Sequence, residues 1–127
     1  MVNSPVHFET GNDNIVIRKI DGTIRGGRTL DVTGFKPDHI NGGHIIIQKT
    51  GEDKYLPMPL KSTLDAYDDL PANHEYAGIL IATIPTDKAF AAILIAGEVN
   101  YKAMPFDVTD ILTALKSALT HIRFRKD

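Results

Sequence analysis

The sequence contains no cysteine. That absence excludes a disulfide scaffold, a zinc site with thiolate ligands and a cysteine nucleophile. An excess of positive charge is also lacking, because the formal net charge is -2 at pH 7. No positive field therefore attracts phosphate backbones, and we expect no binding of nucleic acid. The longest apolar run, residues 90–96, is far too short to cross a bilayer, so we expect no membrane partner.

A length of 127 residues suits one compact domain and is short for two. We predict a single β-rich domain over residues 15–127, preceded by an extended N-terminal arm over residues 1–14 that is rich in turn-forming and polar residues. One piece of the arm alternates like a strand: Val6, His7, Phe8 and Glu9. Residues 1–11 have neither a basic start nor an apolar core, so we expect no cleaved signal peptide.

Two strands are predicted near the start of the domain. Residues 15–20 read Ile-Val-Ile-Arg-Lys-Ile and favour a strand, which the pair Asp21-Gly22 would end in a turn. A weaker strand is predicted near residues 28–32. The double glycine at residues 26–27 indicates a turn or bulge, because the spacing and the following helix of a phosphate-binding loop are lacking.

Two hairpins are predicted farther along the chain. Residues 44–49 and 54–58 are β-capable runs around a polar turn, and Pro57 must end the second strand or place it at an edge. Residues 76–84 and 89–99 are apolar and predict two buried strands joined as a second hairpin. Their alanines would also suit a helix, but their glycines, proline and β-branched residues favour strands. The polar, acidic stretch between the hairpins is predicted to be a surface connection.

One helix is predicted, over about residues 107–120, where the apolar side chains fall on one face and Asp107 or Thr109 can cap the start. The predicted fold class is therefore mainly β, a small β-barrel or β-tulip-like domain with one C-terminal helix. In the tail that follows, Ile122 and Phe124 can still pack. The basic residues of the tail are predicted to be solvated: Arg123, Arg125 and Lys126.

Residue patterns that carry chemistry are lacking. The five histidines stand in separate segments, none with a partner at metal-ligand spacing, and His44 at the start of an apolar strand is predicted to be structural. The acidic stretch around Asp65 has no glycine-centred cation-binding pattern. No serine lies in a nucleophile-elbow pattern. We predict neither an enzyme nor a cofactor. Glu98 and Asn100 are predicted to end the last strand by hydrogen bonding.

The order of segments between about residues 42 and 119 resembles a known family. Gly43 opens a strand before a polar hairpin, an Ala-Gly-Ile-Leu segment follows around Gly78, and a later strand ends in the corner Gly97-Glu98-Val99-Asn100 before a closing helix. This order resembles the lambda-type phage head decoration family and the small head-fibre-type proteins of phages and prophages. The motif residues are packing and turn residues: Gly43, Gly78, Gly97, Glu98 and Asn100.

The resemblance implies a structural virion protein, made in the bacterial host cytoplasm and bound to the outer capsid surface. It implies a homotrimer at threefold positions of an expanded shell, with the phage major capsid protein as partner. The arm residues Val6 to Glu9 would add a strand to that protein. The strands at residues 15–20 and 28–32 depart from the simplest family pattern. Two alternatives stay open: a soluble β-rich module that binds a small ligand or peptide, and a small enzyme.

Overall fold

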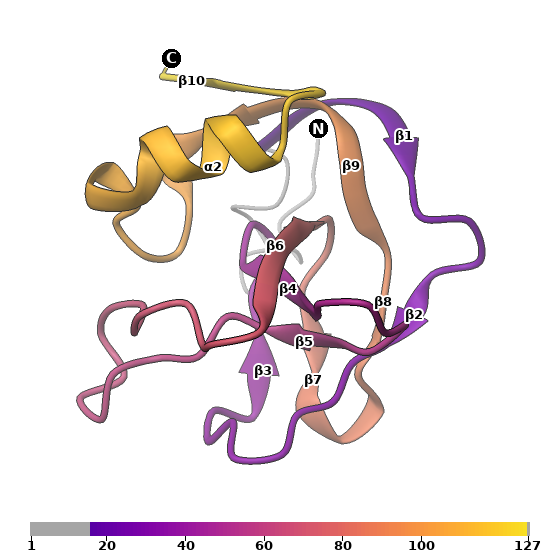
Figure 1. Ribbon diagram of the computed structural model, residues 1–127, viewed down its shortest axis with the longest axis vertical. Coiled ribbons are helices and arrows are strands. Elements are labelled where there is room, and N and C mark those ends of the chain that lie inside the picture. The colour runs from indigo at the N-terminus through magenta and orange to yellow at the C-terminus, as the bar shows by residue number, and fades with distance from the viewer. Residues whose placement is uncertain (1–15, 127) are drawn as a thin grey trace, which may run out of the picture.

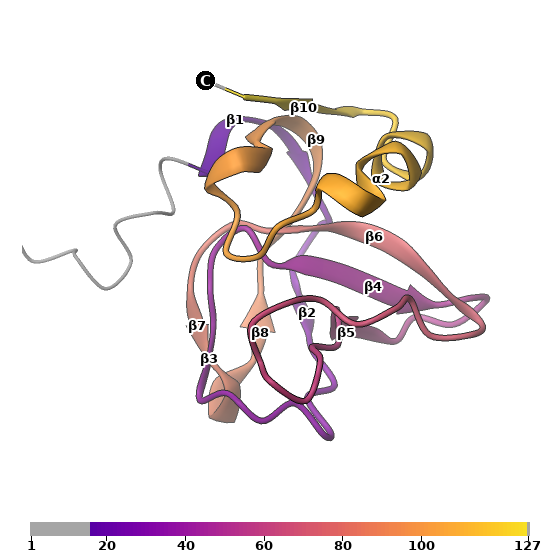
Figure 2. The ribbon, with the colours of Figure 1, turned by 90° about the vertical axis from the view of Figure 1, so that its left-hand side faces the viewer.

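A six-stranded sheet runs through the middle of the molecule (Figures 1 and 2). The computed structural model describes residues 16–126. Of these described residues, 40% lie in strands and 15% in helices, which confirms the predicted mainly β class with a short C-terminal helix. The elements, with 3-10 helices marked η, are β1 (Ile17–Thr23), β2 (Arg28–Thr29), β3 (His39–Ile40), β4 (Ile45–Lys49), β5 (Tyr55–Pro57), β6 (His74–Leu80), β7 (Ile84–Pro85), η2 (Thr86–Lys88), β8 (Phe90–Ala91), β9 (Ile93–Asn100), η3 (Tyr101–Ala103), η4 (Thr109–Ile111), α2 (Leu112–Ala118) and β10 (Ile122–Arg125).

The long strand β9 is the centre of the sheet. β1 lies antiparallel along one edge of it, from Ile17 opposite Val99 to Thr23 opposite Leu94. β6 pairs with the start of β9 and β10 pairs with its end, so these two strands share the other edge. β4 and β5 extend the sheet beyond β6. β10 runs parallel to β9, because the chain between them, with η3, η4 and α2, supplies the crossover that parallel neighbours need.

Both faces of the sheet are covered. Neighbouring residues of a strand point to opposite faces. Ile45 and Ile47 accordingly belong to one apolar cluster, which is covered by Leu115 of α2 and by Leu119, the residue that caps this helix, whereas Ile46 belongs to a second cluster. The second cluster is closed by the short strands β2, β3, β7 and β8, which lie on the opposite side of the sheet from α2 in Figure 2. This double burial explains why the central strands are continuously apolar in sequence.

The sheets formed by residues 16–126 are not closed barrels. β1 and β5 lie at opposite ends of the strand order, so the strands do not close on themselves. The first predicted hairpin is confirmed: β4 and β5 pair antiparallel, and Pro57 ends β5 at the end of the strand order. In the second, β6 and β9 do pair, but only at Ile79 with Leu94 and Leu80 with Ile93. The chain between them pairs elsewhere, β7 with β3 and β8 with β2.

Several predicted boundaries differ from the structure. β1 does not end at Asp21-Gly22 but continues to Thr23, because register shifts let it pass this pair while still facing β9. The α-helix is shorter than the predicted 107–120, since its first turn is the 3-10 helix η4, where Asp107 accepts hydrogen bonds from Thr109. Ile122 and Phe124 are buried in β10, as their pattern indicates. In the described part of the chain, no helix has the length and apolarity to span a membrane.

Candidate functional site

The corner between β1 and β9 contains Gly97, one of the residues on which the family resemblance rests. Gly97 lies opposite Ile20 with φ +150, and a Cβ built on it would collide with the backbone carbonyl oxygen of Lys19. The two strands therefore approach more closely here than any other residue permits. Gly97 is thus a packing residue at the seam between the two strands.

Gly78 and Gly43 serve the same kind of close approach on the other side of β9. A Cβ on Gly78 would lie 2.6 Å from Cγ2 of Ile93, so glycine brings β6 directly against β9. Gly43 precedes β4, and a Cβ there would lie 2.6 Å from Cγ1 of Val16. Its N–H donates to the carbonyl of Leu80 at 2.7 Å, which fixes the entry of the chain into the sheet. Both glycines are thus packing residues.

Glu98 and Asn100 follow Gly97 and have different partners. Oδ1 of Asn100 accepts a hydrogen bond from the N–H of Lys102 at 3.1 Å, which ends β9 and begins η3 as predicted. Glu98 is instead joined to β10: Oε2 lies 3.2 Å from Nη2 of Arg123, and Oε1 lies 4.0 Å from Nε of Arg125. Nη2 of Arg123 also lies 3.8 Å from Asp21 on β1. Arg123 on β10 therefore links three strands, because it pairs with Glu98 on β9 and with Asp21 on β1.

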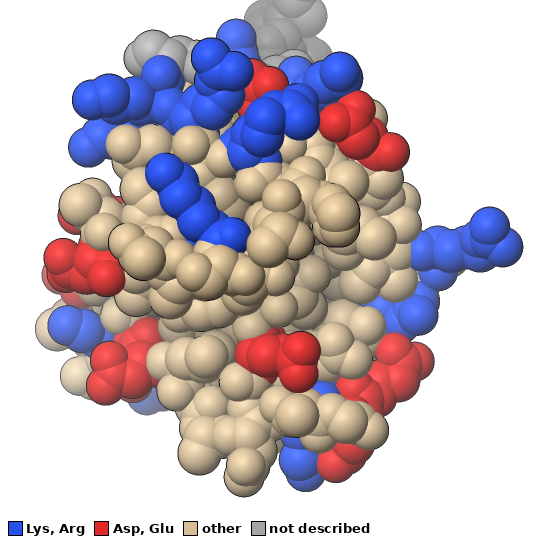
Figure 3. Space-filling model, turned by 45° about the horizontal axis from the view of Figure 1, so that its top comes forward, with Lys and Arg blue, Asp and Glu red and all other residues tan. Residues whose placement is uncertain are grey.

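Positive charge gathers at the end of the molecule that carries these residues. In Figure 3, where the end with β10 and α2 comes toward the viewer, Lys and Arg side chains crowd one edge, with acidic side chains among them. Arg123 and Arg125, predicted to be solvated, remain 51% and 63% exposed although they pair with Glu98. Exposed pairs of this kind contribute little stability individually.

Replacing Glu98 with glutamine is expected to lower the free energy of unfolding by about 1 kcal/mol or less, because water competes for the pairs that it loses. Urea unfolding followed by circular dichroism measures the change, and added salt reduces it. The matched control is Glu52→Gln, which removes the exposed ion pair between Lys49 and Glu52 at 3.2 Å. Its loss should lower the free energy of unfolding by only about 0.3 kcal/mol. A loss at Glu98 that salt leaves untouched contradicts an electrostatic link between the strands.

No strand among residues 16–126 pairs with the outer side of β1. β1 is the first strand in the order, and β9 occupies only one of its edges. Ile20 on β1 is 53% exposed and Ile95, two residues before its partner Gly97, is 40% exposed. A terminal strand of a sheet, beside exposed apolar side chains, is a surface that another chain can extend by main-chain hydrogen bonds.

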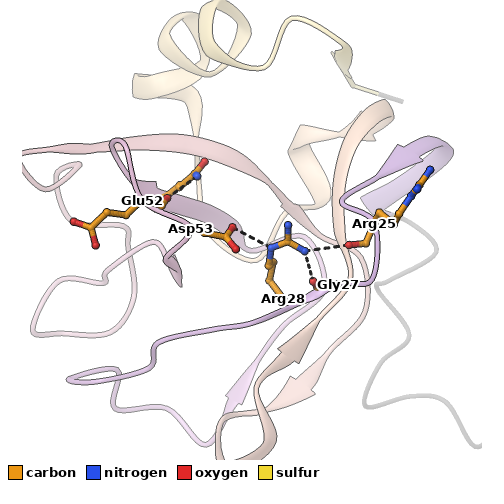
Figure 4. Close-up of polar contacts among 6 residues, drawn as sticks. Arg25, Gly27, Arg28, Glu52 and Asp53 are labelled. Atoms are coloured by element: carbon orange, nitrogen blue, oxygen red, sulfur yellow. Dashed lines mark hydrogen bonds and ion pairs between the residues drawn. The ribbon is translucent and has the colours of Figure 1, made fainter.

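Arg28 fixes the turn that follows this edge strand (Figure 4). Its Nη1 donates to the carbonyl oxygens of Arg25 at 3.0 Å and Gly27 at 2.7 Å, and its Nε donates to Asp53 at 3.2 Å. The guanidinium also lies 5.6 Å from the centre of the Tyr55 ring. The β1–β2 turn is thereby tied to the hairpin of β4 and β5, and the predicted turn at residues 26–27 is confirmed, both glycines having positive φ.

The sequence places His44 in a structural role, and its surroundings agree. His44 is 1% exposed, and its Nε2 lies 2.9 Å from the carbonyl oxygen of Met58, to which it donates. Its ring meets Phe35, Tyr67 and Phe106 edge-on. Burial lowers the pKa of His44 from 6.5 to about 4. Residues 16–126 contain no group of three His, Asp or Glu residues that could hold a metal ion.

The strand-adding residues Val6, His7, Phe8 and Glu9 lie outside the described residues, so their role stays a prediction. No family model, curated protein or solved structure matches the chain. The resemblance to the head decoration family therefore also stays a prediction. The edge formed by β1 was not foreseen as an interaction surface. The residue that could have indicated this surface in the sequence is Ile20, the third isoleucine of residues 15–20, which follows the charged residues Arg18 and Lys19.

Proposed function

We propose that the protein is a non-enzymatic structural protein of a phage virion, which binds the outer surface of the capsid as a homotrimer and stabilises the shell. The observation that carries the proposal is the position of β1 at the end of the strand order, with the exposed isoleucines Ile20 on β1 and Ile95 on β9. The segment order from Gly43 to Asn100 supports the choice of partner through its resemblance to the decoration family.

The proposed mechanism is thermodynamic. A protein that binds only the mature shell stabilises that state by mass action, in proportion to the logarithm of its free concentration over Kd. A trimer that attaches at three points gains avidity, because the second and third contacts become intramolecular. Strand addition supplies main-chain hydrogen bonds, which depend little on the amino-acid sequence of the partner. The arm with Val6 and Phe8 would supply the added strand, as the family resemblance implies.

Capsid binding is tested with shells built from the major capsid protein whose gene lies nearest to the gene for this chain. Expanded and unexpanded shells are each mixed with the purified protein and sedimented. We expect saturable co-sedimentation with expanded shells and little with unexpanded ones. Light scattering on the free protein should give about 42 kDa, three chains of 14.0 kDa. A monomer that binds neither form of shell contradicts the proposal.

Replacing Ile20 with lysine is expected to weaken capsid binding or trimer formation about tenfold without unfolding the protein, because the side chain is already half exposed and the cost falls on the contact surface. Co-sedimentation and light scattering measure the two effects separately. The matched control is Phe90→Lys, which places a lysine at an exposed apolar residue on β8, outside β1 and β9. Equal effects of the two substitutions would remove β1 from the interface.

A further inference from the structure

A groove lies between the loop of residues 31–37 and the segment of residues 56–64. Its volume is about 140 Å³. Sites that hold drug-sized ligands have roughly 300–1,000 Å³. The groove can therefore take one large side chain, with the rest of a ligand lying outside it.

The floor of the groove is apolar and held in place by the core. Phe35 contributes its ring, which packs edge-on against buried His44 with 5.5 Å between ring centres. Leu56 and Leu60 come from β5 and the segment after it, and both pack against the main apolar cluster. Pro57 between them has no N–H to offer a ligand. Such a floor suits an aliphatic or aromatic side chain.

One wall ends in a leucine whose backbone is strained. Leu64 lies in a tight turn, its N–H donating to the carbonyl of Lys61 at 2.8 Å, and the turn is closed by the pairing of Leu60 with Tyr67. The φ of Leu64 is +60, in the left-handed region that leucine rarely adopts, and its side chain is 40% exposed beside the groove. A ligand in the groove would cover this side chain.

The rim of the groove is positively charged. Lys36 lies on one side and Lys61 on the other, and neither ammonium group has an ion-pair partner among residues 16–126. Asp31, the acidic residue of the lining, is already neutralised by Lys54 at 3.2 Å and by a hydrogen bond from Thr33. The two lysines therefore set the sign of the field that a ligand meets.

We propose that this groove binds an extended peptide segment of another protein, in which an apolar side chain enters the groove and a carboxylate next to it pairs with Lys36 and Lys61. This site goes beyond the proposed attachment to the capsid. The apolar floor selects the side chain, and the two ammonium groups select the acid. The contact is small, so a single segment binds weakly.

The test uses the full chain with labelled leucine methyl groups and the probe peptide acetyl-Ser-Gly-Leu-Asp-Gly-Ser-amide, followed by NMR titration. We expect saturable shifts of the methyl resonances of Leu56, Leu60 and Leu64. Peptides with asparagine for the acid, or alanine for the leucine, should bind about tenfold more weakly. The double variant Lys36→Glu, Lys61→Glu should lose the acidic peptide to the same extent. Lys116→Glu on α2, outside the lining, should not.

Three results would overturn the proposal: no saturable shift, equal binding of the acid and the asparagine peptide, or equal binding of free 4-methylpentanoate, which would make the groove a site for small carboxylates. Circular dichroism on each variant confirms that it is folded. The double lysine variant should still sediment with expanded capsids. Loss of peptide binding with intact capsid binding in this variant thus separates the groove from the function proposed above. If the native chain binds the peptide but not the capsid, the peptide site holds and the proposed capsid function fails.

Discussion

Replacing Gly97 with alanine is expected to lower the free energy of unfolding by about 3 kcal/mol. A Cβ at this position would collide with the backbone carbonyl of Lys19, and the φ of +150 is one that side chains disfavour. Backbone atoms cannot rotate away as a flexible side chain could. β1 would have to move off β9, which breaks the pairing from Ile17 to Thr23 and opens the seam that Arg123 bridges through Asp21 and Glu98. Urea unfolding followed by circular dichroism measures the loss.

The matched control for this substitution is Gly51→Ala. Gly51 also has positive φ, +81, but nothing lies within 4 Å of a Cβ built on it, since it occupies the open turn between β4 and β5. Only the conformational cost remains, about 1 kcal/mol. The extra loss at Gly97 measures what the collision and the φ of +150 at the β1–β9 seam add to that cost. Equal losses would mean that β1 yields freely and that the close approach of the strands is not needed for stability.

The buried strands could be predicted from the sequence because their pattern is local. Ile45, Ile46 and Ile47 form an unbroken apolar run, which is typical of a strand covered on both faces, and each face does belong to a different cluster. Turn residues around Gly51 set the ends of the first hairpin. The edge position of Pro57 follows from its missing N–H. In these places neighbouring residues decide the structure.

Long-range pairing explains what the sequence did not reveal. β3 and β7 have two residues each and exist because Ile40 lies opposite Ile84, a contact that no local pattern announces. The parallel pairing of β10 with β9 was missed for the same reason. It brings Arg123 to Glu98 across 25 positions of the chain. An isolated basic tail indicates solvation, and only the crossover through α2 turns it into a strand.

The motif residues illustrate the same division. That Gly43, Gly78 and Gly97 serve packing could be predicted from their places beside strands. The atoms that exclude a side chain could not, because they come from Val16, Ile93 and Lys19. The groove between residues 31–37 and 56–64 was equally hidden, since its two walls meet only after folding.

Lowering the pH from about 6.5 to about 4 is expected to cost the protein about 3 kcal/mol of stability through His44 alone. The imidazole is buried among aromatic rings, and burial lowers its pKa in the folded state to about 4 from 6.5. At pH values between these two pKa values, His44 is protonated in the unfolded chain and neutral in the folded chain. The contribution of His44 to the free energy of unfolding is therefore fully present above pH 6.5 and decreases as the pH falls from 6.5 to about 4. Below about pH 4 it changes no further, because His44 is protonated in both states.

His44→Phe separates this effect from every other titration. Phenylalanine cannot bind a proton, so urea unfolding at a series of pH values should show a nearly flat stability from pH 6.5 to 4. Stability at pH 7 should be lower than that of the native chain by about 1 kcal/mol, because the carbonyl of Met58 loses its donor. His121→Gln at an exposed position should keep the slope of the native chain. Hydrogen bonds from Thr33 lower the pKa of Asp31 from 3.8 to about 2. The stability that Asp31 contributes is therefore lost mainly as the pH falls from 3.8 toward 2, below the range of this experiment. A slope that survives His44→Phe would place the acid sensitivity outside the aromatic cluster, and His44 would then be a packing residue without influence on the pH range of the fold.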